Sequence, residues 1–297
     1  MDEAASTAQR AHPDHDAVAR EVSGWFTASA PEIGYQVSQD WYGYRSDLSP
    51  AETRVILRIG RPEQVPAALA AVRVASGPRA LTIWVDDRAR AARLDAAIRS
   101  AGARPRTATT HLALVGPVQA QPGPPGLVLQ PAGGTRLEEW ATVKLQCFGD
   151  TEAAPAPGRL AREVALRRAE LALAEYQFGL LGGERVAVLA YYRGAAQMVF
   201  NLGTRVPYRH RGIGQRMLAR WAAAGTASGC RSLVINADDS GRPARLYRGL
   251  GFTDEVYWYQ GYRLDGVGAA RKAELCWGNA GSGARRKLNP PATTGST

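Results

Sequence analysis

The stretch that decides the fold is residues 203–218, which read GTRVPYRHRGIGQRML. An apolar run typical of a strand ends here in a short basic loop, and apolar residues at helical spacing follow. The start of a helix has free backbone N–H groups and the positive end of the helix dipole, and both favour a bound phosphate. Gly212 and Gly214 have no side chain where the backbone must approach that phosphate. The stretch therefore predicts a pyrophosphate site between a strand and a helix.

The spacing of these residues, Arg209-x-x-Gly212-x-Gly214, argues against two common nucleotide sites. Dinucleotide-binding folds carry Gly-x-Gly-x-x-Gly, and P-loops carry Gly-x-x-x-x-Gly-Lys followed by Ser or Thr. Neither pattern fits the stretch, so NAD and ATP are poorly supported as ligands.

The same spacing resembles the acyl-CoA motif of the GCN5-related N-acetyltransferase (GNAT) family, which is Arg/Gln-x-x-Gly-x-Gly/Ala at a strand-to-helix turn. Downstream, residues 244–252 read ARLYRGLGF, which is similar to the Leu-Tyr-x-x-x-Gly-Phe end of these domains. The two motifs stand in the family's order, with a predicted helix and a predicted strand between them. The resemblance covers about residues 127–264. It implies an α/β fold with a mixed sheet, and acetyl-CoA as the acyl donor.

The resemblance also implies roles for residues in both motifs. Tyr247 matches the tyrosine that, in the family, lies beside the thioester sulfur and protonates the departing thiolate. The cofactor-binding residues that the resemblance implies are Leu202, Gly203, Thr204, Val206, Arg209, His210, Arg211, Gly212, Ile213, Gly214, Gln215, Ser240 and Arg245.

The implied reaction, acyl transfer from a thioester to an amine, needs an acid for the leaving thiolate and a hydrogen-bond donor for the oxyanion. Backbone N–H groups around residues 202–204 can supply that donor. The chain departs from the family in two ways: Ser240 stands where an Asn is frequent, and residues 195–206 contain no carboxylate to act as general base. A water wire, a remote acid or an acceptor of low pKa must then serve as the base.

Several other residues with reactive side chains have an ordinary structural explanation. We expect Cys147 to pack rather than act as a nucleophile, and His210 to face solvent. His12 and His15 lie in an unpatterned segment without further ligands, so we expect no metal site. Five acids near loops expected to face the acceptor are each explained as solvated charges, although together they could attract a cationic amine. These acids are Asp150, Glu152, Asp238, Asp239 and Glu255.

Composition and charge exclude several classes of protein. The chain has 297 residues, 45% of them hydrophobic, and no apolar run approaches the ~18 to 20 residues of a membrane helix. The first residues lack the apolar region of a secretory signal, so we expect a cytoplasmic protein. Three scattered cysteines support neither a disulfide framework nor a zinc site. Of the net charge of +10, five basic residues against one acid lie in residues 267–297, so we expect no nucleic-acid partner.

Proline and glycine divide the chain into two domains, because residues 117–126 (PVQAQPGPPG) can continue neither a helix nor a central strand. The first domain lacks both family motifs, but its last helix resembles that of the GNAT fold. We interpret it as a degenerate copy that cannot hold CoA, in tandem with the second. Its aromatic-rich insert at residues 32–47 suits either local packing or a flat acceptor. The predicted parts are a disordered arm (1–13), the degenerate N-terminal domain (14–118), a linker (119–126), the catalytic domain (127–266) and a disordered basic tail (267–297).

Hydrophobic periodicity and the punctuation by Gly and Pro predict alternating strands and helices. The predicted strands are 53–60, 80–85, 110–116, 127–130, 176–181, 186–192, 196–206, 231–237 and 256–264. The predicted helices follow Pro62 up to Gly77 and Asp86 or Asp87 up to Ala101, and then span 135–147, 159–174, 214–228 and 242–249.

The sequence therefore predicts an acyl-CoA-dependent N-acyltransferase that transfers acetyl from acetyl-CoA to a primary amine of a small metabolite, biosynthetic or antibiotic-like. The amine attacks directly, with Tyr247 as general acid. Two alternatives stay open: a transferase of tandem GNAT fold that takes an aminoacyl group from tRNA, and a non-catalytic acyl-CoA-binding regulatory module. The pyrophosphate motif argues against the first, and Tyr247 argues against the second. The sequence predicts neither the acceptor nor the oligomeric state.

Overall fold

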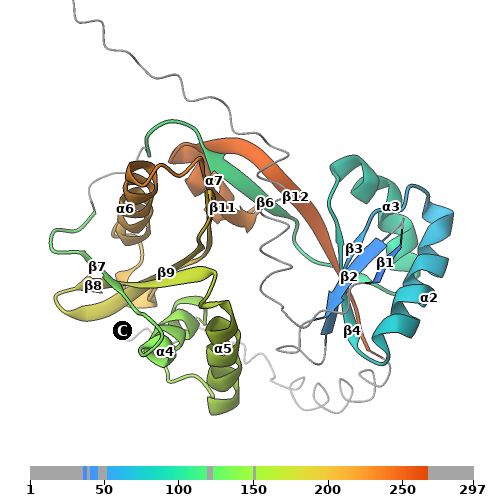
Figure 1. The fold of residues 1–297 in the computed structure, drawn as a ribbon, viewed down its shortest axis with the longest axis horizontal. Helices are drawn as coiled ribbons and strands as arrows, with labels where there is room; N and C mark the ends of the chain where they lie inside the picture. Colours follow the sequence, from blue (N-terminus) through green and yellow to red (C-terminus); the bar gives the residue numbers. More distant parts are fainter. Residues whose placement is uncertain (1–35, 39–40, 46–51, 119–122, 150–151, 267–297) are drawn as a thin grey trace, which may run out of the picture.

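The computed structural model describes residues 36–38, 41–45, 52–118, 123–149 and 152–266 (Figure 1). The predictions for the arm, the tail, His12, His15 and Asp150 lie outside these residues, as does half of the aromatic insert.

Helices and strands alternate along most of the chain. In chain order they are β1 (Gln36–Ser38), β2 (Trp41–Arg45), β3 (Glu52–Leu57), the 3₁₀ turn η1 (Pro62–Gln64), α2 (Val65–Ser76), β4 (Ala80–Val85), α3 (Arg88–Ser100), β5 (Arg104–Pro105), β6 (Thr109–Leu114), β7 (Val128–Pro131), α4 (Leu137–Phe148), α5 (Pro157–Glu170), β8 (Ala174–Leu181), β9 (Glu184–Tyr192), β10 (Ala196–Thr204), η2 (Val206–Tyr208), α6 (Ile213–Ala227), β11 (Ser232–Asp238), α7 (Arg242–Gly249) and β12 (Phe252–Leu264).

The described strands form one mixed sheet. Their order is β1-β2-β3-β4-β12-β6-β11-β10-β9-β8-β7, and β5 pairs with β12 beside this path. The pairs β3–β4 and β10–β11 are parallel, and each is connected by a helix that crosses the sheet. The other neighbouring strands are antiparallel. The predicted α/β fold with a mixed sheet is confirmed.

Two strands connect the N-terminal half of the described chain, β1 to β6, with the C-terminal half, β7 to β12. β6 precedes the Pro/Gly stretch in sequence, yet it lies between β11 and β12. β12 pairs with β6 through Phe252–Tyr259 and then with β4 through Gln260–Leu264. Figure 1 shows both strands running from one half toward the other. The sheet is therefore continuous, and residues 117–126 do not separate two sheets.

The order strand, helix, strand, helix, strand occurs twice, as β3-α2-β4-α3-β6 and as β10-α6-β11-α7-β12. The sequences agree in part as well. Residues 76–87 read SGPRALTIWVDD and residues 228–239 read SGCRSLVINADD, with seven identical residues among twelve. This segment enters the second strand of each parallel pair and ends at two aspartates. The two halves thus share a stretch of sequence, the order of their elements and one parallel pair of strands connected by a helix.

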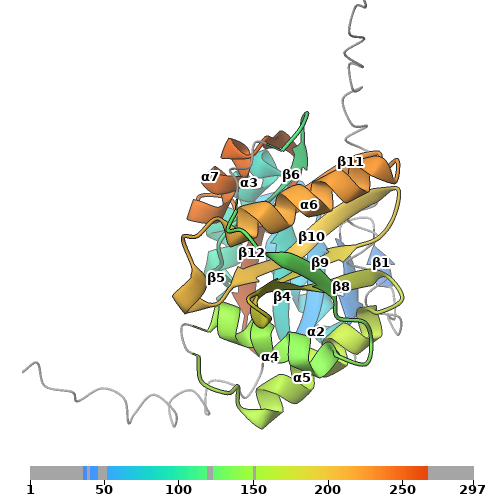
Figure 2. The ribbon, with the colours of Figure 1, turned by 90° about the vertical axis from the view of Figure 1, so that its left-hand side faces the viewer.

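The core divides into three clusters of buried side chains. One lies on the face of the sheet that α4 and α5 cover, around Trp140 and Phe178. A second lies on the opposite face under α6 and α7, where Trp221 and Phe252 pack. A third lies in the N-terminal half, and it includes Tyr262 from β12. Figure 2 shows the first two layers on opposite sides of β8–β10.

Most predicted elements occur within a few residues of their predicted ends, and β4 and α7 match completely. Asp87 caps α3, with its side chain accepting a hydrogen bond from the backbone N–H of Arg90. Three strands, β1, β2 and β5, were not predicted. β5 has only two residues and β1 only three, too few for a period of two to be recognised. Among the described residues, no helix combines the length and the hydropathy that crossing a bilayer requires.

We predict that Leu112→Ala lowers the free energy of unfolding by about 2–5 kcal/mol, because it leaves a cavity in a packed core. Leu112 lies on β6, is 1% exposed and belongs to the cluster under α6 and α7. Amide exchange should accelerate in β11 and β12 together, since β6 pairs with both. Val74→Ala is the matched control, because Val74 is 85% exposed and should change neither quantity. If amide exchange accelerated only in the N-terminal half, the placement of β6 between β11 and β12 would be contradicted.

Candidate functional site

The parallel strands β10 and β11 are hydrogen-bonded only in their first halves and diverge beyond them. Their pairing covers Ala196–Val199 of β10 and Ser232–Ile235 of β11. On its other side β10 pairs with β9 throughout, from Met198 to Thr204, with a register shift between Val199 and Asn201. β11 pairs with β6 from Val234 to Asp238, so residues 201–204 and 236–238 keep only these outer partners. Alternate backbone groups on the inner edge of β10 therefore face a gap in the sheet rather than a neighbouring strand.

The start of α6 is open beside this gap. The helix begins at Ile213, and within the described chain no side chain caps its N-terminus. The first N–H groups of a helix have no intrahelical acceptor, and the helix dipole makes this end positive. Gly212 precedes the helix with a φ of 75°, which favours glycine. The predicted anion site is thus a set of free donors at a positive helix end.

Gly214 brings the first turn of α6 against the end of β10. A Cβ built on Gly214 would lie 3.8 Å from Leu202 Cδ2 and 3.9 Å from Thr204 Oγ1. The start of α6 and the end of β10, which both present free backbone donors, are therefore adjacent. The anionic group of a ligand could bind the start of α6, while an extended chain of the same ligand lies in the gap beside β10.

The structure places the predicted site residues in three segments. These segments are the end of β10 (Leu202, Gly203, Thr204), the loop and first turn of α6 (Val206, Arg209, His210, Arg211, Gly212, Ile213, Gly214, Gln215), and α7 with the loop before it (Ser240, Arg245, Tyr247).

Two loop arginines are engaged inside the protein. Arg209 donates from Nη2 to the carbonyl of Cys147 at 2.9 Å and from Nε to that of Thr204 at 3.2 Å. Arg205 donates from Nε to Glu152 at 2.7 Å and from Nη1 to Glu184 at 2.6 Å. The guanidinium of Arg209, expected to contact phosphate, instead fastens the loop to the last turn of α4. A cation is also favourable at that helix end.

Arg211 is the loop arginine that stays available to an anion. Its guanidinium lies over the ring of Tyr208 at 5.3 Å, and no carboxylate of the described chain pairs with it. His210 lies on the surface as expected, with a φ of 63° and its Nδ1 3.4 Å from Nη2 of Arg242. Arg245 donates to the backbone carbonyl of Ser240 at 3.0 Å. These residues surround the open helix end with positive charge.

Tyr247 packs into the core under α6 and α7. It is 8% exposed, and its ring lies edge-on to Phe252 with centroids 6.5 Å apart. The same cluster includes Leu202 from the end of β10. Burial raises the pKa of Tyr247 to about 12, so the hydroxyl keeps its proton at neutral pH. A protonated hydroxyl is what a general acid requires.

Cys147 is a packed thiol. It is buried, and burial raises its pKa to about 12, which leaves almost no thiolate at neutral pH. A Cβ built on Gly203 would lie 2.6 Å from the Cβ of Cys147, so this pair closes the contact between β10 and α4. The packing explanation agrees with the structure, and the glycine at 203 is required by that contact.

Three of the five loop acids expected to attract a cationic amine are paired with arginines. Arg88 of α3 donates to Asp239 at 2.8 Å and to Glu255 at 2.6 Å, and Arg205 binds Glu152. Burial opposes ionisation of Asp239, but hydrogen bonds from Arg88 and Trp258 lower its pKa. Their charges are therefore balanced by arginines. Sequence spacing could not show this, because Arg88 belongs to the other half.

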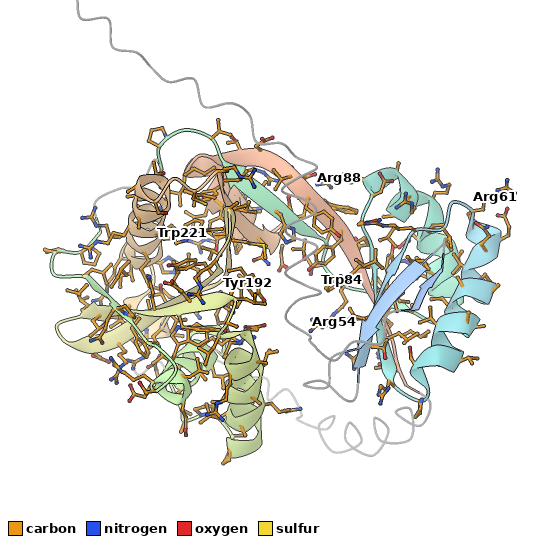
Figure 3. All side chains as sticks on the ribbon, in the orientation of Figure 1. Arg54, Arg61, Trp84, Arg88, Tyr192 and Trp221 are labelled. Atoms are coloured by element: carbon orange, nitrogen blue, oxygen red, sulfur yellow. The ribbon has the colours of Figure 1, made fainter. Side chains whose placement is uncertain are left out.

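The sequence reasoning missed a row of rings that crosses from one half to the other. His111 of β6 lies 5.3 Å from Tyr257, and Trp84 of β4 lies 4.8 Å from Tyr259, measured between ring centroids. Figure 3 shows Trp84 on the side of the sheet that faces the C-terminal half. The signal that could have found the row is the alternation of tyrosines in β12.

His111 lies level with the gap in the sheet. It is opposite Asn236 of β11, one residue beyond the last residue that pairs with β10. Burial lowers the pKa of His111 to about 3, so its ring is neutral at physiological pH. Among the described residues, no group of His, Cys, Asp and Glu is arranged to hold a metal ion.

The sequence matches no protein-family model and no curated protein. Solved structures that resemble the chain include the following three. A GCN5-related N-acetyltransferase from Kribbella flavida is 19% identical, with a TM-score of 0.60 over 85% of this chain and 97% of that one. One from Sphaerobacter thermophilus is 17% identical, with a TM-score of 0.56 over 84% and 92%. A tandem GNAT protein from the clavulanic acid biosynthesis pathway is 16% identical, with a TM-score of 0.51 over 75% and 78%. These likenesses show that the chain has the GNAT fold.

We predict that Arg209→Ala lowers the free energy of unfolding by about 1–3 kcal/mol, because the variant removes the donor to two backbone carbonyls. Arg211→Ala is the matched control in the same loop. Its side chain is exposed and forms no ion pair in the described chain, so the change should stay within about 0.5 kcal/mol. Urea denaturation measures both. Equal losses in the two variants would contradict the bracing role of Arg209.

Proposed function

We propose that the chain is an N-acyltransferase that uses acetyl-CoA to acetylate a primary amine of a small metabolite. The observation that carries this proposal is the gap between β10 and β11, which lies directly beside the uncapped start of α6. The gap fits an extended pantetheine arm, and the helix start fits the pyrophosphate to which that arm is attached. The fold that the chain shares with GCN5-related N-acetyltransferases supports the same conclusion.

The pyrophosphate would bind at the first turn of α6. Backbone N–H groups of Ile213, Gly214 and Gln215 point along the helix axis toward it. Arg211 adds a cation from the loop, whereas Arg209 holds the loop to α4. Each anionic oxygen would thus meet a fixed donor in a region of positive charge, which is how proteins bind phosphate without a metal ion.

The acyl group would lie at the mouth of the gap. The pantetheine amides would pair with the inner edge of β10 at residues 201–204, as an added strand would. N–H groups of that edge would also donate to the carbonyl oxygen as it gains negative charge. The amine attacks the thioester carbon, the C–S bond breaks, and the nitrogen releases a proton.

Tyr247 would supply the proton that the departing thiolate takes. Its raised pKa keeps it protonated at neutral pH, and the hydroxyl would donate its hydrogen to the sulfur as negative charge develops there during C–S cleavage. β10 carries no carboxylate, so the proton from the amine would leave through water. The half-buried rings of Tyr257 and Tyr259, which pack beside the buried ring of His111, would form a flat, uncharged floor for the acceptor.

The N-terminal half would be a degenerate copy of the same unit. The buried positions of α3 are Ala91, Leu94 and Ile98, and those of α7 with its C-cap are Ala244, Tyr247 and Leu250. Leu94 thus stands where the other half has the tyrosine. The domains would span residues 14–118 and 127–266, with β6 given to the sheet of the second.

Thermal shift separates the proposal from the two alternatives. A ligand at 100 times its Kd stabilises a protein by ~2.7 kcal/mol. Acetyl-CoA should raise the melting temperature and tRNA should not, and release of free thiol with a panel of amines should follow. Stabilisation by tRNA alone would favour aminoacyl transfer. Stabilisation by acetyl-CoA without turnover on any amine would favour a regulatory module.

We predict that Gly214→Val raises the Kd for acetyl-CoA at least tenfold, because the branched side chain would occupy the space of the pyrophosphate. Gly214→Ala is the matched control, since its Cβ meets only ordinary contacts with Leu202 and Thr204. Its affinity should stay within about threefold of the parent. Calorimetry measures both, with circular dichroism to check folding. Unchanged affinity in the Val variant would remove the helix start from the donor site.

We predict that Tyr247→Phe lowers kcat at least tenfold and leaves acetyl-CoA affinity unchanged, because the hydroxyl acts only as the thiolate departs. The pKa of about 12 means that the parent enzyme should lose no activity through this group below about pH 11. Saturating kinetics across pH provide the measurement. Parent-like turnover in a folded Phe variant would leave Tyr247 with a packing role.

A further inference from the structure

Arg88 connects the two halves of the molecule through its guanidinium. It is the first residue of α3, in the N-terminal half, and both of its carboxylate partners belong to the C-terminal half. Nη1 donates to Asp239 at 2.8 Å, and Nε and Nη2 donate to Glu255 at 3.2 and 2.6 Å. The guanidinium also lies over the ring of Trp258, 4.5 Å from the ring centroid. Figure 3 shows Arg88 between α3 and β12. One side chain of the N-terminal half thus binds both β12 and the loop that follows β11.

Asp239 accepts hydrogen bonds from side chains of three different elements. Besides Arg88 of α3, Nε1 of Trp258 in β12 donates to it at 3.0 Å, and Nη2 of Arg248 in α7 donates to it at 3.4 Å. Its backbone N–H donates to the carbonyl of Ala108 at 2.8 Å. Asp239 lies three residues before α7 begins and also binds the last turn of that helix. The position of this aspartate therefore affects both ends of α7.

The helix α7 depends on such contacts because it is short and uncapped. It has eight residues, and helices of this length are marginal without tertiary packing. Within the described chain, no side chain caps its start. In the segment that both halves share, Asp87 stands at the position of Asp239, and Asp87 caps its own helix by accepting from the N–H of Arg90. In the C-terminal half, the equivalent aspartate binds Arg88 of the other half instead.

Tyr247 is the neighbour of Arg248 in α7, so its hydroxyl moves with the helix. A general acid must lie within about 2.6–3.2 Å of the atom that receives its proton. A displacement of about 1 Å can lower the rate of a reaction by about 100-fold. A contact that fixes α7 therefore influences proton transfer to the thiolate without touching the substrate.

We propose that Arg88 is a positioning residue for the acyl transfer: by bridging Asp239 and Glu255, it fixes α7 and holds the Tyr247 hydroxyl at the departing thiolate. Glu255 is a firm second anchor, because the buried Thr110 of β6 donates to it at 2.8 Å. A guanidinium suits this role, since its planar donors fix the direction of each hydrogen bond. The inference rests on the proposed function, and it gives the N-terminal half a part in the chemistry of the other half.

Kinetics of Arg88→Ala with saturating acetyl-CoA and amine test the proposal. kcat should fall about tenfold or more, while the Kd for acetyl-CoA stays within about threefold of the parent. Arg99→Ala is the matched control and should keep the parent kcat. Arg99 lies on the same helix with a similar exposure, 53% against 51%, and pairs only with Asp95 of that helix in the described chain. Arg88→Lys keeps the charge if the Ala variant does not fold, and it should also lose turnover, because an ammonium lacks the planar fork that bridges both carboxylates.

The double variant Arg88→Ala/Tyr247→Phe decides whether Arg88 acts through Tyr247. Its kcat should equal that of Tyr247→Phe alone, because the hydroxyl that Arg88 positions is already absent. Losses that multiply in the double variant, or parent-like kcat in both Arg88 variants, would overturn the proposal.

Spectra of ¹³C-labelled tyrosine provide a readout that needs no turnover. Tyr247→Phe identifies the Tyr247 ring signal, which should shift in the folded Arg88 variants and stay in place in Arg99→Ala. An unmoved signal in the Arg88 variants would overturn the positioning role. If no amine is acetylated and the signal still shifts, the link from Arg88 to Tyr247 is supported and the proposed function alone fails.

Discussion

The separation of β10 from β11 is the constraint on which the rest of the structure depends. A strand that loses a neighbour leaves backbone groups without partners, so a gap inside a sheet is costly unless both strands are held elsewhere. β9 holds β10 through Thr204, and β6 holds β11 through Asp238. Because β6 comes from the N-terminal half, that half stabilises a gap that serves the other half. The two halves are therefore one structural unit even though their element orders repeat.

The direction of the arginine side chains then determines where positive charge stays available. Arg205 and Arg209 bind inward, to carboxylates and to carbonyls, and they fix the loop that leads into α6. Arg88 neutralises Asp239 and Glu255 on the other side of the gap. Of the three arginines in this loop, only Arg211 stays available to an anion, together with the start of the helix. Arg205 and Arg209 hold the loop in place, while Arg211 stays exposed. The donors of such a fixed loop would need little rearrangement when an anion binds.

Much of this could be predicted from sequence, and the exceptions share one cause. Helices and strands follow from local periodicity, and the strand-to-helix turn at Gly212 and Gly214 follows from local motif spacing. The placement of β6 between β11 and β12 could not be predicted, because periodicity identifies a strand and not its neighbours. The same limit applies to Arg209, whose acceptors are the carbonyls of Cys147 and Thr204, and to Arg88. Each of these contacts depends on tertiary packing across distant or looped segments.

The contrast between the two helix starts shows why only one half would hold a nucleotide. α6 begins after Gly212 with uncapped N–H groups and an exposed arginine beside them. α2 begins after a 3₁₀ turn with prolines at 62 and 66, each of which removes a backbone donor. The backbone N–H of Arg61 donates to Gln64 at 3.1 Å, and Glu63 adds a negative charge to the same turn. An anion at α2 would thus meet few donors and a repelling carboxylate. β3 also stays paired with β4 through Ile56, so no gap opens beside that helix. The N-terminal half therefore repeats the order of elements but lacks the features that would bind an anion at α6.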